Sequence, residues 1–438
     1  MRFTQSNRLR KKSHALIPGG AHTYSKGDDQ FPELSPGFIV RGRGAYVWDL
    51  DGNKFLDWGM GLRSTTLGYG YKPVLDAVRK QITRGANFPR PSPLEVELAE
   101  LLVEIIPCAE MVKFAKNGST VTTAAVKLAR AYTGRDLVAI CSDQAFYSYD
   151  DWFIGSKEIN RGVPQAIREL TVSFKFNDIK SLENLFDKYS GKIACVILEP
   201  ATEIEPQEEF LKKVQFLCKK NGAVFILDEM ISGFRWHLRG AQHVYGVTPD
   251  MATYGMGIAN GFSVAVLAGR RDIMSLGSIY GSHERVFLIS TTHGAENHAL
   301  AAAIATINEL KNKDVVGHMR AVGAQLKDCL NGIHRQYGLE NILNIFGGVP
   351  CRLAMSVSSH EAYDSSLLKT YFFQEIISQG ILFNGYFSPS YSHGEREIET
   401  TKNAWRFACS QLRAALYHKN IKSKLIGKPV KLVFRKYN

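Results

Sequence analysis

The sequence predicts an α/β fold with a large domain, built on a mostly parallel sheet covered by helices, and a small α+β domain. Between residues 70 and 325, strand-like and helix-like segments alternate. The strand-like segments, such as IACVILEP and AVFILDE, are continuously apolar, which indicates burial on both faces of a parallel sheet. The chain has 438 residues, more than one core usually contains, so a second domain is expected.

We divide the chain into three segments. Residues 1–69 form an N-terminal segment with a β-meander, because GFIVRGRGAYVWDLDGNKFLDW alternates apolar and polar residues around Asp51-Gly52. Residues 70–325 form the large domain. Residues 326–438 form the small α+β domain, with a strand near Cys351–Val357 and a helix near Thr400–Tyr417.

The helices of the large domain carry recognisable start and stop signals. YKPVLDAVRKQITRG has Pro73 early and Gly85 at its end. SPLEVELAELLVEIIP begins at Ser92, and Glu95 three residues later completes a capping box. TVTTAAVKLARAYTG ends at Gly134. Strands are expected at MVKFAK, LVAICS, IACVILEP, AVFILDE, DMATYG and VAVLAGR.

Composition and charge exclude several classes of protein. The seven cysteines are dispersed without metal-ligand spacing, which predicts free thiols in a cytoplasmic protein and no metal site. No apolar run approaches the roughly 20 residues that cross a bilayer, so no membrane association is expected. The net charge of +12 resides at the chain ends, with five Lys/Arg in residues 1–12 and eight in residues 413–438. These ends are either solvated or attract an acidic or phosphorylated partner; nucleic-acid binding is not expected, because no basic stretch forms a known module.

Polar residues follow three of the predicted strands, where open α/β sheets bind ligands. After MVKFAK, Asn117, Gly118, Ser119 and Thr120 lead into a helix, which predicts either a phosphate site or an ordinary helix cap. Asp228 ends AVFILDE, and such a carboxylate requires a partner: Arg235, a metal ion or a protonated ring nitrogen.

Two further strand ends add to this edge. Glu199 ends IACVILEP, and AFYSYDDWF follows LVAICS with five aromatic residues. The aromatic run forms either core or a surface on which a flat ring stacks. Phosphate cradle, carboxylate and aromatic surface together fit pyridoxal phosphate, whose chemistry also requires a lysine.

The sequence resembles the class III aminotransferases among the fold-type I pyridoxal-phosphate enzymes, and within them the glutamate-1-semialdehyde aminomutase branch. IPGGAHTYSKG, NGSTVTTAAVKLARAYTGRD, ILDEMISGFR and STTHGAENHAL carry the resemblance, in the family's order and over nearly the whole chain. The resemblance implies that Gly118, Ser119 and Thr120 hold the phosphate. It further implies a ring-stacking role for Phe146, a pyridine-nitrogen partner in Asp228, and an active-site wall containing Glu199. Thr291 would reach the phosphate of a neighbouring subunit, so a homodimer with shared active sites is implied.

Two positions depart from the family pattern. Lys26 stands where the aminomutase has an arginine that grips a carboxylate, and a lysine cannot form the same bidentate fork. Met256 stands in the place of the Schiff-base lysine. Methionine is close to lysine in length but has no amine, so it fills the space without forming the covalent link.

We interpret Met256 as an engineered replacement in an aminotransferase that moves an amino group from a donor, glutamate, to a carbonyl acceptor of a sugar type or a small aldehyde or ketone. Lys26 and Tyr147 are the expected substrate contacts. The alternatives are an aminomutase, a natural non-catalytic ligand-binding relative, and altered chemistry through another residue. This catalytically impaired chain is expected to hold the cofactor non-covalently, as pyridoxal phosphate, pyridoxamine phosphate or an external aldimine.

Overall fold

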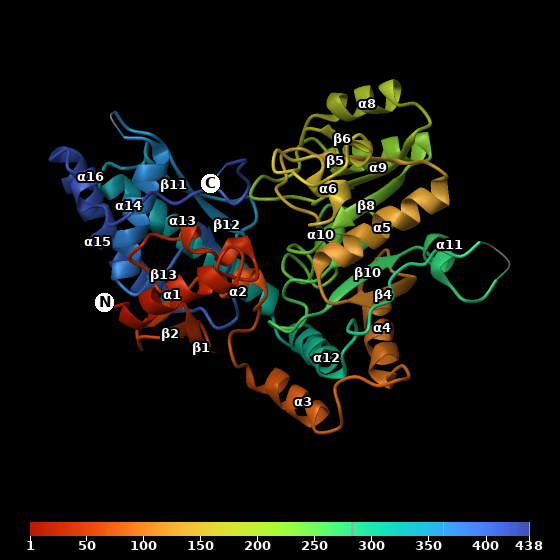
Figure 1. Ribbon diagram of the computed structural model, residues 1–438, viewed down its shortest axis with the longest axis horizontal. Helices are drawn as coiled ribbons and strands as arrows, with labels where there is room; N and C mark the ends of the chain where they lie inside the picture. Colours follow the sequence, from red (N-terminus) through yellow and green to blue (C-terminus); the bar gives the residue numbers. More distant parts are fainter. Residues whose placement is uncertain (282–283, 362, 438) are drawn as a thin grey trace. The chain divides into compact units, whose positions relative to one another are not determined.

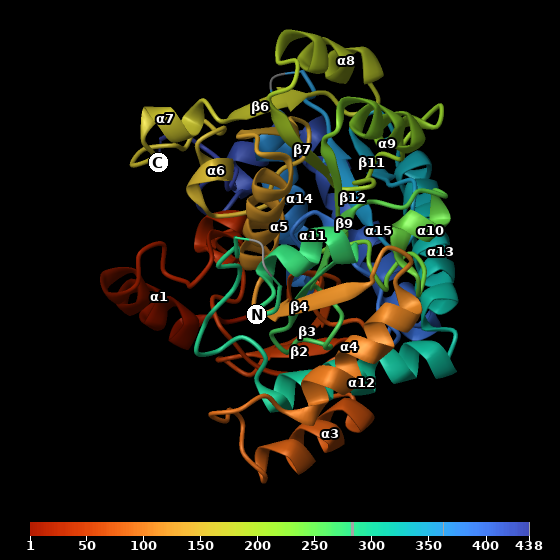
Figure 2. The ribbon, with the colours of Figure 1, turned by 90° about the vertical axis from the view of Figure 1, so that its right-hand side faces the viewer.

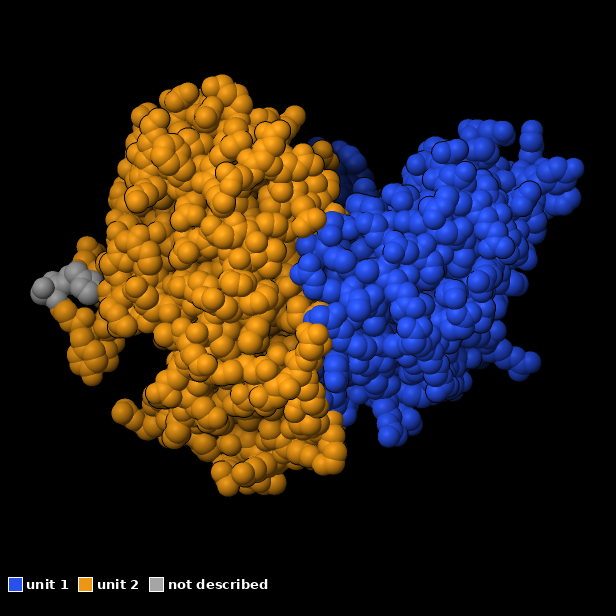
Figure 3. All heavy atoms as spheres, turned by 180° about the vertical axis from the view of Figure 1, so that it is seen from behind, with its two compact units in different colours: residues 1–71, 317–438 blue, residues 72–316 orange. Residues whose placement is uncertain are grey.

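The computed structural model describes residues 1–281, 284–361 and 363–437, and the chain forms two compact units. Unit 1 comprises Met1–Tyr71 and Gly317–Asn438, and unit 2 comprises Lys72–Val316 (Figure 3). The predicted N-terminal segment and the whole of the predicted C-terminal domain therefore share unit 1, together with residues 70–71 and 317–325 of the predicted large domain. Positions 282, 283, 362 and 438, which fall in the two larger predicted segments, lie outside the described residues.

Unit 2 contains a seven-stranded sheet of order β4-β10-β9-β8-β7-β5-β6 (Figure 1). Strand β10 is antiparallel to β4 and β9, and the other neighbours are parallel, which confirms the predicted mostly parallel sheet. All residues of β7 to β10 are buried, as their continuous apolar sequences predict. The strands are β4 Met111–Ala115, β5 Leu137–Cys141, β6 Thr171–Phe174, β7 Ile193–Leu198, β8 Val224–Asp228, β9 Met251–Tyr254 and β10 Ala265–Gly269.

Helices cover this sheet and extend beyond it. Helix α5 packs on β7, β9 and β10, and α3 and α12 lie side by side (Figure 2). The capping box predicted at Ser92 is present, since Leu94 N–H donates to Ser92 Oγ and Ser92 N–H to Glu95 Oε1. The helices are α3 Lys72–Ile82, α4 Pro93–Ile105, α5 Gly118–Thr133, α6 Asp151–Ile154, α7 Gln165–Arg168, α8 Ile179–Lys188, α9 Phe210–Asn221, α10 Gly240–Val244, α11 Arg271–Met274, η3 Ser275–Gly277 and α12 Asn297–Asn312.

Unit 1 holds two small sheets, of order β1-β2-β3-β13 and β11-β12-β14, together with helices. The predicted meander, C-terminal-domain strand and C-terminal helix are confirmed as β1 to β3, β12 and α15. Its elements are α1 Thr4–Leu16, η1 Tyr24–Lys26, η2 Asp28–Gln30, β1 Ile39–Arg43, β2 Tyr46–Asp49, β3 Lys54–Asp57, α2 Met60–Arg63, α13 Val315–Gln336, β11 Leu343–Phe346, β12 Leu353–Val357, α14 Ser365–Ser378, β13 Ile381–Leu382, β14 Tyr386–Phe387, α15 Glu395–Tyr417 and α16 Ile421–Lys424. In the described part of the chain, no helix combines the length and apolar character needed to cross a membrane.

The strand directions gather the predicted site residues of unit 2. Because β10 is antiparallel to both β4 and β9, β4 runs in the same direction as β9 and the parallel strands. The carboxyl ends of β4, β5, β7, β8 and β9 therefore lie at one edge of the sheet. The polar residues that follow these strands meet there, as expected for ligand binding in open α/β sheets.

Candidate active site

The loop between β4 and α5 leads into a helix start whose first backbone N–H groups could bind an anion. Asn117 caps α5, and its side chain accepts hydrogen bonds from the backbone N–H and the hydroxyl of Thr120, at 3.0 and 3.1 Å. Among the described residues, none accepts a hydrogen bond from the N–H of Gly118 or Ser119. Two such N–H groups at the positive end of a 16-residue helix fit a phosphate.

Asp228, the last residue of β8, is a buried carboxylate with one oxygen held by the protein. Its exposed fraction is 3%. The Thr253 hydroxyl and the Met230 N–H donate to Oδ1, at 2.9 and 3.0 Å. No described residue donates a hydrogen bond to Oδ2. The two bonds orient the carboxylate and leave Oδ2 for a donor on a ligand.

A second carboxylate makes this place unfavourable for negative charge. Leu198 of β7 pairs with Leu227 of β8, so Glu199 and Asp228 follow adjacent paired residues. Burial, and then the charge of Glu199, raises the pKa of Asp228 to about 7, against the opposing bonds from Met230 and Thr253. A positively charged donor at Oδ2 stabilises the ionised carboxylate. The site therefore fits a protonated ring nitrogen.

The two other partners considered for Asp228 have less support. Arg235 Nε donates to the carbonyl of Ile231, at 3.3 Å. Within the described ranges, no three His, Cys, Asp or Glu side chains are grouped so that they could hold a metal ion.

The aromatic segment after β5 presents one open ring and one buried ring. Phe146 is 44% exposed, and its ring meets that of Phe153 edge-on, with centroids 5.8 Å apart. Tyr147 is buried; its ring also meets Phe153 edge-on, and its hydroxyl donates to Gln144 Oε1. The exposed Phe146 ring suits stacking on a flat ligand. The predicted substrate contact of Tyr147 stays a prediction, and in this structure its hydroxyl serves the protein interior.

Met256 lies two residues after β9, in a loop that approaches the loop between β4 and α5. Its side chain is 38% exposed. A Cβ added to Gly255 would lie 2.6 Å from Met230 Sδ, and one added to Gly118 would lie 3.0 Å from the same sulfur. The Met230 thioether thus lies against the backbone of both loops. The two glycines permit this approach, which brings residue 256 close to the helix start.

The predicted roles of two further residues are not tested by the structure. Thr291 is exposed in the segment before α12, and its hydroxyl donates to the His293 carbonyl at 3.2 Å. Its expected role requires a second subunit and stays a prediction. Lys26 ends η1 in unit 1 and is exposed. Its predicted contact with substrate likewise stays a prediction.

Three residues that the sequence analysis did not single out shape the site. Thr253 and Met230 both donate hydrogen bonds to Asp228. The Met230 sulfur also lies against the two loops that contain Gly118 and Gly255. Gln144 is buried and hydrogen-bonds the backbone of Glu199. Thr253 carries a weak sequence signal, as a polar residue inside an apolar strand. Gln144 carries none, because its partner lies 55 positions away.

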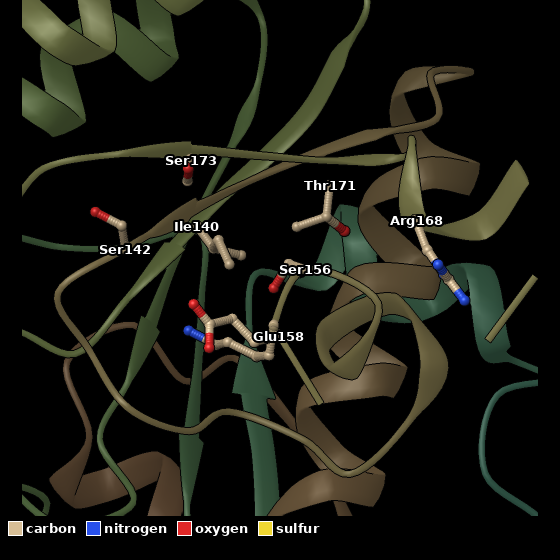
Figure 4. A pocket seen from close by; sticks show the side chains of 8 residues that line it. Ile140, Ser142, Ser156, Glu158, Arg168, Thr171 and Ser173 are labelled. Atoms are coloured by element: carbon tan, nitrogen blue, oxygen red, sulfur yellow. The ribbon is translucent and has the colours of Figure 1, made fainter. Parts of the chain in front are cut away.

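A polar cavity of about 440 Å³ opens beside β5 and β6 (Figure 4). None of the predicted site residues lines it. One of the lining residues, Lys157, donates from Nζ to the Gln144 carbonyl at 3.3 Å. The cavity is lined by Ile140, Ser142, Ser156, Lys157, Glu158, Arg168, Thr171 and Ser173.

The sheet order and the site at its edge define the class of protein. A mostly parallel seven-stranded sheet of this order is the architecture of the fold-type I transferases, as predicted. A family model described as aminotransferase class-III matches residues 26–385, and the chain belongs to this family. The predicted class III resemblance is confirmed.

Known relatives agree with this assignment. The glutamate-1-semialdehyde 2,1-aminomutase of Francisella philomiragia is 32% identical over 423 residues, covering 90% of this chain and 96% of the relative. The aminomutase of Chlorobium phaeovibrioides is 32% identical over 433 residues, covering 92% and 97%. An omega-transaminase from Sphaerobacter thermophilus superposes with a TM-score of 0.83 at 25% identity, covering 93% of this chain and 98% of that structure.

Proposed function

We propose that this chain is a pyridoxal-phosphate-dependent aminotransferase scaffold in which Met256 occupies the position of the Schiff-base lysine. Its reaction would transfer an amino group from glutamate to a carbonyl acceptor, a sugar-type compound or a small aldehyde or ketone. The observation that carries the proposal is the buried Asp228 carboxylate, whose Oδ2 lacks a protein donor and whose raised pKa favours a cationic partner. The family membership and the PLP-bound solved relatives support the same cofactor.

Each residue of the site has a stated task in this proposal. Gly118, Ser119 and Thr120 would hold the phosphate, Gly118 and Ser119 through their backbone N–H groups. Asp228 would hold a proton on the ring nitrogen through Oδ2. Phe146 offers its ring face, and Glu199 forms part of the wall. When bound, pyridoxal phosphate supplies an electron sink for the bond that breaks at the substrate carbon bearing the amino group. Met256 has no group that holds or moves a proton at the substrate Cα, so this chain is expected to turn over very slowly.

Replacing the methionine by lysine tests the proposal. Met256→Lys is expected to bind pyridoxal phosphate covalently: borohydride reduction followed by peptide mass analysis should find the cofactor on residue 256. The control Met256→Leu keeps the side-chain bulk without an amine and should lose the cofactor on gel filtration, like the unaltered chain. A lysine variant that takes up no cofactor would contradict the proposal.

The aminomutase is the second candidate, favoured by the relatives at 32% identity. The two reactions differ in their need for a separate amino donor. If Met256→Lys converts glutamate to 2-oxoglutarate beyond a single turnover only when a carbonyl acceptor is added to take up the amino group, the transferase is supported. Isomerisation of one substrate without a donor supports the aminomutase. A third candidate, a natural ligand-binding relative, rests on Met256 itself. The codon in the natural gene decides this, because a lysine codon at 256 excludes it.

We further propose a homodimer with shared active sites, in which Thr291 of one subunit reaches the phosphate of the other. The exposure of Thr291 supports this arrangement, because its side chain is accessible to a second subunit. Mixing two inactive variants tests it. A Thr291→Val chain combined with a chain altered at Asp228 should regain cofactor affinity at one site per dimer.

A further inference from the structure

Gln144 lies just beyond the carboxyl ends of two neighbouring strands. Strand β5 ends at Cys141 and its parallel neighbour β7 at Leu198, and Ile140 and Ile197 are their last paired residues. Beyond this point the two chains carry different parts of the site: β5 leads to the aromatic segment and β7 to Glu199. Gln144 lies at this divergence and is 1% exposed.

The Gln144 side chain replaces the missing backbone pairing. Its Nε2 donates to the Glu199 carbonyl at 2.9 Å, and its Oε1 accepts from the Glu199 N–H at 2.8 Å. This reciprocal pair resembles the bonding of neighbouring strands, extended by one residue through a side-chain amide. A buried amide with both groups satisfied fixes its partner firmly, because breaking either bond leaves a buried polar group unpaired.

The same amide also holds the aromatic segment. The Tyr147 hydroxyl donates to Gln144 Oε1, and the rings of Tyr147 and Phe146 both pack edge-on against Phe153. Lys157 contacts both parts: its Nζ donates to the Gln144 carbonyl and lies 4.7 Å from the centroid of the Phe153 ring. Gln144 therefore links the support of the exposed Phe146 ring to the backbone of Glu199.

The aromatic segment is tied in turn to the phosphate-binding helix. Ser119 Oγ accepts a hydrogen bond from the Tyr149 N–H at 3.1 Å, and Thr122 Oγ1 donates to the Tyr147 carbonyl at 2.9 Å. A continuous set of bonds thus runs from the phosphate-binding turn through the aromatic segment to Gln144 and Glu199. In this set, Gln144 is the residue that bonds to Glu199.

We propose that Gln144 is a positioning residue that sets the distance between the Phe146 ring and the carboxylates of Glu199 and Asp228. The inference rests on the proposed function, since the space between these groups is where the cofactor ring would lie. Gln144 itself contacts neither cofactor nor substrate in this proposal. Removing its side-chain amide loosens both the aromatic segment that carries Phe146 and the segment that carries Glu199. Strands β5 and β7 end before these segments and stay paired.

The test uses the full chain with Met256→Lys as parent, and adds Gln144→Leu or Gln144→Glu. Leu keeps the bulk and removes all three hydrogen bonds of the Gln144 side chain. Glu keeps the length but sets a carboxylate oxygen against the Glu199 carbonyl. The matched control is Gln374→Leu in unit 1, a buried glutamine whose Nε2 donates to the Lys424 carbonyl and whose Oε1 accepts from the Ile426 N–H.

Two readouts separate positioning from general stability: pyridoxal phosphate affinity by fluorescence titration, and the induced circular dichroism of the bound cofactor. Both Gln144 variants are expected to bind about tenfold more weakly and to change the dichroism band. Gln374→Leu should lower the melting temperature but leave both readouts unchanged.

The outcomes are distinguishable. Gln144 variants that fold and match the parent in both readouts overturn the positioning role, as does a Gln374→Leu variant that changes them equally. If Leu does not fold, Gln144→Glu decides the question. A parent that binds no pyridoxal phosphate overturns the proposed function itself, before any Gln144 variant is compared.

Discussion

The Thr253 hydroxyl donates a hydrogen bond of 2.9 Å to Oδ1 of Asp228, and the two residues face each other in register across β9 and β8. This contact fixes the carboxylate at the strand end, with Oδ2 directed to other donors. It also lowers the pKa of Asp228, in opposition to the stronger effects of burial and of Glu199. The protein thereby keeps an acid of high pKa in a defined orientation.

Ionisation of Asp228 is expected to destabilise the ligand-free protein as the pH rises. The pKa rises from an ordinary 3.8 to about 7 on folding, so the folded state binds more protons within this window. The free energy of unfolding then falls with rising pH by up to about 1.4 kcal/mol per unit. Asp228→Asn removes this effect. In urea unfolding, the free energy of unfolding of the variant should therefore rise relative to that of the parent between pH 4 and 7.

Thr253→Val supplies the matched control for that experiment. Removal of the hydroxyl takes away a bond to the ionised carboxylate, so the pKa of Asp228 should rise further and the pH window should extend upward. Parallel stability profiles for Asp228→Asn and the parent would contradict the assignment.

Gly255→Ala is expected to destabilise unit 2 through Met230. The new Cβ would lie 2.6 Å from Met230 Sδ and 3.3 Å from its Cε, closer than packed atoms allow. Overpacking of this kind costs about 1–3 kcal/mol. In a Met230→Ala background the same substitution should cost much less, so the two changes should be non-additive in denaturant unfolding. Additive effects would show that the sulfur does not cause the cost.

Lys26→Arg is expected to change substrate preference. Arg presents two parallel N–H donors to a carboxylate, whereas Lys acts as a single charge. In a Met256→Lys background, Lys26→Arg should lower KM for a substrate with a carboxylate at that site by about tenfold, with little change in kcat. The control Lys26→Gln should raise KM. If KM is unchanged in both variants, Lys26 does not contact the substrate.

The sequence predicted the strand ends that build the site. Asp228 and Glu199 each end a continuous apolar run, and Phe146 follows another, so their place at one edge follows from a parallel sheet. The edge strand β6 was not predicted, because its alternating sequence TVSF is only four residues long and gives little signal. Helix α1 was missed for a related reason: TQSNRLRKKSHAL has few apolar residues.

Side-chain partners at the site depend on register and could not be predicted. Thr253 meets Asp228 only because β9 pairs with β8 in one register. Gln144 meets Glu199 only because β5 and β7 end together. The buried Tyr147 shows the same limit, since the aromatic run did not indicate which ring faces outward.

His393 in unit 1 is expected to make the protein sensitive to acid. Its ring stacks on Trp58, with centroids 4.0 Å apart. The Ser390 N–H donates to Nδ1, so the neutral ring carries its proton on Nε2, which donates to the Asp57 carbonyl at 3.1 Å. Burial lowers the pKa of His393 to about 3, and the neighbouring His318 acts in the same direction.

Because the folded state binds fewer protons at His393, the free energy of unfolding should fall as the pH drops from 6.5 toward 3, by up to about 1.4 kcal/mol per unit. This slope opposes that of Asp228 over much of the same range, so the two partly cancel in the parent. Relative to the parent, His393→Gln should be less stable near neutral pH, and this difference should shrink as the pH falls. Relative to the parent, Asp228→Asn should instead become less stable as the pH falls. If the double variant equals the sum of the two singles at each pH, the groups titrate independently; a His393→Gln profile parallel to the parent would contradict the buried neutral ring.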